Sequence, residues 1–90
     1  MGVVYDEVFI STMKEINVCK NEIRKLSKVA YDMETKYNLS TVEFMERFNS
    51  GTMGEGKDYR EWYDSYAGLK GWEQRLKEFQ EILENAAKTT

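Results

Sequence analysis

Apolar residues recur every seven positions in two long stretches of this chain. In the first stretch they are Phe9, Ile16, Ile23, Ala30 and Tyr37, with Cys19, Leu26 and Met33 three residues after three of them. In the second they are Trp62, Leu69, Leu76 and Leu83, with Trp72, Phe79 and Ala86 at the offset positions. Such spacing gives each helix one apolar stripe, which needs a partner helix to cover it. We therefore predict an all-α fold built as a long antiparallel helical hairpin with coiled-coil-like packing.

Local signals set the limits of the first two helices. The first helix is expected over about 6–36, and Asn38 follows it as a residue that tolerates the left-handed conformation. Ser40 stands three residues before Glu43, which is the S-x-x-E pattern of a capping box. A short helix over about 41–49 should therefore lie between the two long ones.

A glycine-rich stretch at 50–57 separates the short helix from the last one. Asp58 is a candidate N-cap there, and the last helix is expected over about 59–86. Gly68 and Gly71 fall inside it, and each lowers helix stability by about 1 kcal/mol relative to alanine. They predict either a kink or a close approach of another part of the backbone, and the neighbouring Trp72 favours close packing.

With 90 residues, the chain forms one helical domain, 1–90. A hairpin of this size buries few large side chains, and the crude balance of burial against conformational entropy comes out near zero. A single cysteine allows no internal disulfide that could add stability. We therefore expect a homodimer, arranged as a four-helix bundle, or a complex with another protein.

The formal net charge of −3 comes entirely from the second half of the chain. Residues 1–39 carry six basic and six acidic side chains, whereas residues 40–90 carry seven basic and ten acidic ones. Nucleic-acid binding needs an excess of Lys and Arg, so the charge disfavours it. An acidic half instead suits a small basic protein as partner, although a solvated helix surface explains the same balance.

Cys19 occupies an apolar position of the first stretch and is expected to be a small buried hydrophobe. A lone thiol fits a reducing compartment, so we expect a cytoplasmic protein. The sequence shows no signal peptide and no membrane-spanning stretch, which predicts no contact with a membrane.

Candidate chemistry is sparse. The chain has no histidine, so neither a metal site nor an activated thiol is expected, and no cofactor is predicted. The stretch from Gly51 to Lys57 matches the start of a P-loop, but Asp58 stands where the motif needs Ser or Thr, and a helix precedes it instead of a strand. No nucleophile, base and orienting group come together, which predicts that the protein is not an enzyme.

Aromatic residues cluster at the start of the last helix. Tyr59, Trp62, Tyr63 and Tyr66 either pack as core against the short helix or form a protein-binding patch. Base stacking is a third alternative, which the neighbouring Glu61 and Asp64 oppose. On the first helix, Lys20, Arg24 and Lys28 make a short basic stripe that we read as a solvated face.

The central part of the chain resembles a known group of proteins. Its motifs are Lys36-Tyr37-Asn38-Leu39-Ser40, Glu43-Phe44, Phe48, Ser50-Gly51, Asp58-Tyr59 and Glu61-Trp62. They are similar to those of small helical antitoxin-like proteins of prokaryotic toxin–antitoxin pairs. The resemblance covers residues 36–66, about a third of the chain. It departs at Val42, where that group has a second glutamate, and in a loop richer in glycine.

The resemblance implies a non-enzymatic protein-binding module that masks a basic toxin. Under this hypothesis the last helix meets the partner through two tyrosines and five acidic side chains, Tyr63, Tyr66, Glu61, Asp64, Glu78, Glu81 and Glu84. The competing class is a homo-oligomeric structural or assembly protein, and a direct nucleic-acid binder ranks third.

Overall fold

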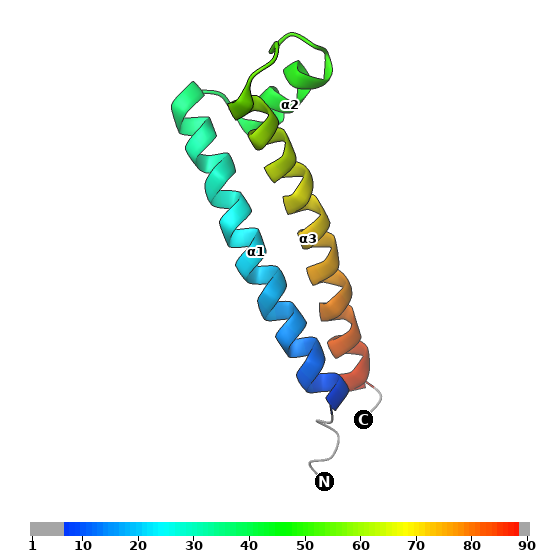
Figure 1. The fold of residues 1–90 in the computed structure, drawn as a ribbon. Helices are drawn as coiled ribbons and strands as arrows, with labels where there is room; N and C mark the ends of the chain where they lie inside the picture. Colours follow the sequence, from blue (N-terminus) through cyan, green and yellow to red (C-terminus); the bar gives the residue numbers. More distant parts are fainter. Residues whose placement is uncertain (1–6, 89–90) are drawn as a thin grey trace.

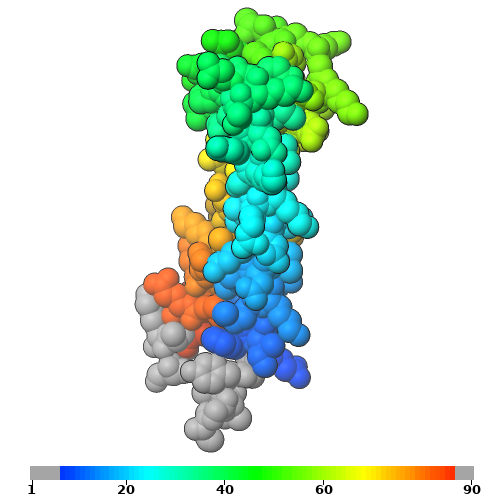
Figure 2. Space-filling model, turned by 90° about the vertical axis from the view of Figure 1, so that its left-hand side faces the viewer, coloured from blue at the N-terminus to red at the C-terminus, as the bar shows by residue number. Residues whose placement is uncertain are grey.

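The computed structural model describes residues 7–88, with side chains placed up to residue 86, and over this range all the regular secondary structure is helical. Helix α1 spans Glu7–Tyr37, α2 spans Thr41–Asn49 and α3 spans Lys57–Lys88. The two long helices run antiparallel and side by side, while α2 lies at the end where they are connected (Figure 1). The molecule measures 59 × 19 × 17 Å, and Figure 2 shows its slender shaft with α2 at one end. The predicted helical hairpin with an intervening short helix is thus confirmed.

The predicted apolar stripes face each other along the hairpin. Ile16, Cys19, Ala30 and Trp62 are buried, and most other stripe residues are half-buried because each helix has only one long neighbour. Two positions correct the prediction. Ala86 is exposed, since it lies near the open end of the hairpin. Ser65, which falls at an offset position of the same repeat, is buried at 7% exposure.

The connection between α1 and α2 follows the predicted caps. Asn38 has a φ of 50°, the left-handed conformation that ends α1. Ser40 caps α2, and its hydroxyl accepts a hydrogen bond from the Glu43 amide at 3.1 Å. The Glu34 carboxylate, from the last turns of α1, accepts from the Thr41 amide at 2.8 Å. Two orphan amides of the short helix are therefore satisfied, which fixes its direction relative to α1.

A stacked aromatic pair forms the core where the three helices meet. Phe44 of α2 and Trp62 of α3 are both fully buried, and their rings stack with 4.0 Å between centroids and an angle of 3°. The Trp62 indole N–H donates to the Thr41 hydroxyl at 3.0 Å, which satisfies the only polar atom of that side chain. Tyr37 and Tyr59 pack around this pair. The core interpretation of the aromatic cluster is confirmed for Trp62 and Tyr59, and also for Tyr63, which stacks on Phe48.

Asp58 does not cap α3. The helix begins at Lys57, and the Arg60 amide already donates to the Gly56 carbonyl at 3.1 Å. The Asp58 carboxylate instead accepts hydrogen bonds from Lys36 Nζ and Tyr37 Oη, each at 2.6 Å. These two bonds hold the pKa of Asp58 below its ordinary value. The residue joins the end of α1 to the start of α3.

The two glycines inside α3 differ in their surroundings. A Cβ added at Gly68 would lie 3.2 Å from the Leu26 side chain of α1, so this glycine permits a close approach. At Gly71 nothing lies within 4 Å of such a Cβ. Since α3 continues as one helix through both, close packing explains only Gly68.

Candidate protein-interaction surface

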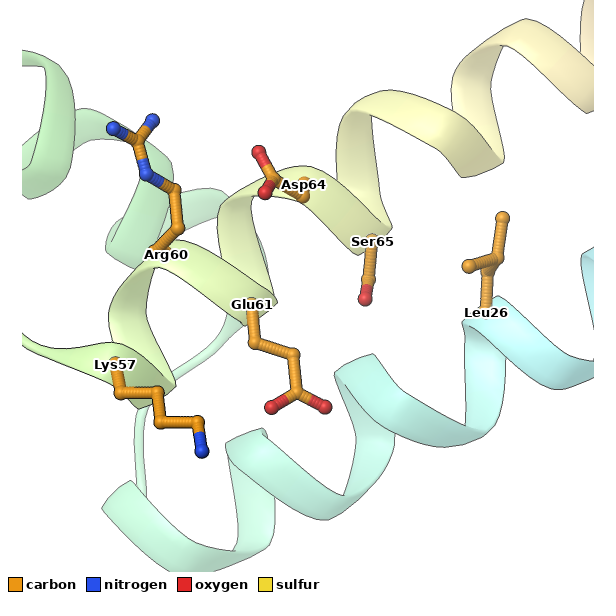
Figure 3. A pocket seen from close by; sticks show the side chains of 6 residues that line it. All are labelled: Leu26, Lys57, Arg60, Glu61, Asp64 and Ser65. Atoms are coloured by element: carbon orange, nitrogen blue, oxygen red, sulfur yellow. The ribbon is translucent and has the colours of Figure 1, made fainter.

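Two shallow depressions follow one another along α3. The first, of about 390 Å³, is lined by Leu26 of α1 and by Lys57, Arg60, Glu61, Asp64 and Ser65 (Figure 3). The second, of about 350 Å³, is lined by Gly68, Gly71, Trp72 and Arg75. We call the two together the α3 groove.

The lining residues share one face of α3 because they repeat every seven positions. Lys57, Asp64 and Gly71 form one row, and Glu61, Gly68 and Arg75 form the adjacent row. Residues seven apart lie almost above one another on a helix. Leu26, which lines the first depression, also lies against Gly68 in the second. The α3 groove is therefore one surface along the junction of the two long helices.

The first depression carries mixed charge. Lys57 and Glu61 extend toward α1, while Arg60 and Asp64 point away from it (Figure 3). Ser65 lies to one side of these four side chains, toward Leu26, with its own side chain directed at α1 (Figure 3). Two cations and two carboxylates make this depression a polar surface without a dominant sign.

The second depression is more apolar. Trp72 is half-buried, and Gly71 beside it leaves part of the neighbouring space empty. The Arg75 guanidinium lies 5.0 Å from the centre of the Trp72 ring, a cation–π contact. On the α1 side, Cys19 is buried, and burial raises the pKa of its thiol while Arg75 opposes that shift. Tryptophan and arginine are the residue types most enriched at binding hot spots.

The two candidate tyrosines do not share a face with their acidic neighbours. Tyr63 stacks on Phe48 of α2, with 4.7 Å between centroids, so it helps to hold α2 in place. Tyr66 is half-buried, and Lys70 Nζ lies 5.3 Å from its ring centre. Tyr63 is two residues from Glu61, and Tyr66 two from Asp64, so each tyrosine projects roughly 200° away from that acid.

The remaining candidates lie farther along α3. Glu78, Glu81 and Glu84 are exposed, and Glu78 accepts a hydrogen bond from Gln74 at 3.2 Å. Fourteen residues separate Glu78 from Asp64, which corresponds to roughly 21 Å along the helix. The structure thus divides the predicted site residues into three sets: the two tyrosines, Glu61 with Asp64 at the groove, and the distal glutamates.

Sequence reasoning missed the lining of the second depression. Gly68 and Gly71 predicted a kink or a close approach of the backbone, and Trp72 predicted core packing, but none of them predicted a depression. A signal was present, since the rows Lys57–Asp64–Gly71 and Glu61–Gly68–Arg75 have the same seven-residue spacing as the apolar stripe.

The basic stripe of α1 is exposed, in line with a solvated face. Arg24 donates to Asn21 at 2.9 Å, and Lys28 pairs with Asp32 at 3.1 Å. Exposed pairs of this kind contribute little to stability.

Between residues 7 and 88, no three His, Cys, Asp or Glu side chains are placed to hold a metal ion. Over the same range, neither long helix has a stretch apolar enough to cross a lipid bilayer. Comparison of the chain with protein-family models, curated proteins and solved structures found no match.

Proposed function

We propose that this chain is a non-enzymatic protein-binding module, an antitoxin-like regulator that covers a small basic partner in the cytoplasm. The observation that carries the proposal is the exposed run of Glu78, Glu81 and Glu84 on α3. The three carboxylates outnumber the one exposed lysine of that stretch, Lys77, so this surface of α3 is net negative. Such a surface accelerates encounter with a basic protein and selects against acidic ones.

The fold supports this role because it holds α3 in place by contacts outside the acidic run. The stacked Phe44 and Trp62 anchor the first turns of α3, and Asp58 ties them to the end of α1. The distal half of α3 is held beside α1 by the half-buried Leu76, Phe79 and Leu83 of its apolar stripe. Preordering of this kind reduces the entropy lost on association. The likeness of residues 36–66 to antitoxin-like proteins points the same way.

The test is affinity purification of the tagged full chain from its source cell, with partners identified by mass spectrometry. We expect one small basic protein at a fixed ratio. Replacing Glu78, Glu81 and Glu84 together by glutamine should weaken binding of this partner roughly threefold to a hundredfold, since each exposed ion pair contributes roughly 0.2–1 kcal/mol.

A matched control removes three glutamates elsewhere. Glu43, Glu46 and Glu55 are exposed at the α2 end, and their replacement by glutamine changes the net charge by the same amount. This variant should retain the partner. Equal loss in both variants would mean that net charge alone matters, and unchanged recovery in the first would remove the distal acidic run from the proposal.

A homo-oligomeric assembly protein is the second candidate, and one observation favours it. Most of the large apolar side chains that the structure leaves exposed gather toward the open end of the hairpin, namely Val8, Ile10, Met13, Val18 and Ile82. A second copy could cover them in a dimeric four-helix bundle. Sedimentation equilibrium of the purified chain at several concentrations separates the two: a tight dimer without any partner supports assembly, and a monomer supports the regulator.

A further inference from the structure

We infer that the second depression of the α3 groove, around Gly71 and Trp72, docks an amphipathic helix of the basic partner. The docked helix carries an apolar residue that enters the depression, and a Lys or Arg seven residues before and after it. The inference rests on the proposed function and names the surface and the chemistry by which the partner is recognised.

The shape of the surface determines where the docked helix carries its apolar residue. Gly71 has no side chain and nothing lies within 4 Å of where a Cβ would be, so an incoming side chain meets open space. One wall of that space is the Trp72 ring, which is only half-buried by the protein itself. Glycine also lets a second helix approach closely, within the 8–10 Å at which helices pack. An aliphatic side chain placed there would complete the burial of the tryptophan.

The charges around the depression determine where the docked helix carries its two basic residues. Asp64 and Glu78 are exposed and stand seven residues on either side of Gly71, in the same row of α3. Each carboxylate is therefore roughly 10 Å from Gly71 along the helix and on the same face. A helix lying along α3 with the same seven-residue spacing brings one cation to each of them.

Other charged groups also lie near this face. On α1, Glu22 and Lys25 pair with each other at 3.2 Å. Of the residues lining the depression, only Arg75 is charged, and it lies over the Trp72 ring. Asp64 shares the first depression with Lys57, Arg60 and Glu61, and Glu78 accepts a hydrogen bond from Gln74 at 3.2 Å. A cation of the partner therefore meets each carboxylate beside other polar groups, and the spacing of Asp64 and Glu78 about Gly71 gives the selectivity.

The probe is a 21-residue helical peptide of alanine and glutamine with one leucine at position 11 and lysines at positions 4 and 18. Its control has the same composition but lysines at positions 6 and 16, which turns them about 140° from the leucine. Each peptide is titrated into the ¹⁵N-labelled full chain while amide and indole N–H signals are followed. The Gly71 amide and Trp72 indole signals should shift saturably. The indole signal of Trp62, buried and bonded to Thr41, should stay in place.

We expect the first peptide to bind roughly threefold to tenfold more tightly than its control, as two exposed ion pairs allow. Gly71→Leu should weaken binding at least about tenfold, because leucine fills the depression while favouring helix more than glycine does. Gln80→Leu is the matched variant: it introduces the same side chain at an exposed position of α3, roughly 180° around the helix from Gly71, and should bind like the wild type.

The inference is overturned if the first peptide causes no saturable shift up to millimolar concentration, if both peptides bind equally, or if Gly71→Leu binds as well as Gln80→Leu. These results are independent of the affinity purification. If a basic partner copurifies but the peptide does not bind, the proposed function is retained and the partner binds a different surface. Peptide binding without any cellular partner would support the groove and remove the function.

Discussion

Replacing Thr41 by valine should lower the free energy of unfolding by about 1–3 kcal/mol, because it removes the hydrogen-bond acceptor of the Trp62 indole. Valine has nearly the same shape as threonine, so the packing around α2 is kept. Trp62 is 0% exposed, and no water can replace the lost hydroxyl without opening the aromatic core. The unsatisfied buried N–H therefore accounts for most of the expected effect.

In a domain of this size, a loss of about 2 kcal/mol corresponds to a decrease of roughly 8–16 °C in Tm. Urea unfolding followed by far-UV circular dichroism measures the free energy directly. Thr35→Val is the control, since the Thr35 hydroxyl donates to the Tyr31 carbonyl at an exposed position of α1. It should change stability by no more than about 0.5 kcal/mol.

A double-mutant cycle with Trp62→Phe isolates the hydrogen bond from the change in ring size. Phenylalanine has no N–H, so Thr41→Val should be much less damaging in that background, with a coupling energy of about 1 kcal/mol. A Thr41→Val protein as stable as Thr35→Val, or a coupling energy near zero, would refute the reasoning.

Three further predictions concern stability and reactivity. The hydrogen bonds of Asp58 keep its folded-state pKa low, so their contribution is present above the unfolded pKa of about 3.9 and is lost as pH falls through the folded value. The urea concentration at the unfolding midpoint should therefore decrease when the pH is lowered below about 4. The decrease should be smaller in Asp58→Asn, and equal decreases in the two proteins would contradict this. Gly71→Ala should raise the free energy of unfolding by about 0.5–1 kcal/mol in urea titrations. Gly68→Ala should raise it by less, because the new Cβ would lie 3.2 Å from Leu26. A larger increase for Gly68→Ala than for Gly71→Ala would refute this prediction. Cys19, buried and with a raised pKa, should react slowly with an aromatic disulfide reagent in buffer and rapidly in urea, whereas fast reaction of the native protein would show an accessible thiol.

The hairpin was predictable because the residues that specify it form a local and periodic pattern in the sequence. The seven-residue repeats at Ile16 and Trp62 specify which helix faces are buried, whatever the rest of the chain does. Ser40 and Glu43 specify the start of α2 in the same local way, and the structure agrees. The start of α3 was misplaced because Asp58 has two partners, Lys36 and Tyr37, that are more than twenty residues away. A distant hydrogen-bond donor leaves no periodic signal.

The candidate surface was only partly predictable. The acidic residues were found from composition, but composition does not give their angular positions on α3. Counting residues would have separated Tyr63 from Glu61, since neighbours two apart lie on different faces of a helix. The depression at Gly71 is a part of the α3 surface that the side chains of α1 do not cover. Its presence depends on how far each α1 side chain extends toward α3, which the sequence pattern does not give.

The position of α2 makes resistance to local unfolding unequal along the molecule. The fully buried Phe44 and Trp62 close one end, and Ile16 with Cys19 covers the middle of the shaft. At the other end, where α1 begins and α3 finishes, side chains such as Phe9 and Leu83 are only half-buried. Amide protons should exchange fastest there and slowest around the aromatic pair. A processive protease would accordingly engage the open end first and meet its greatest mechanical resistance only on reaching α2.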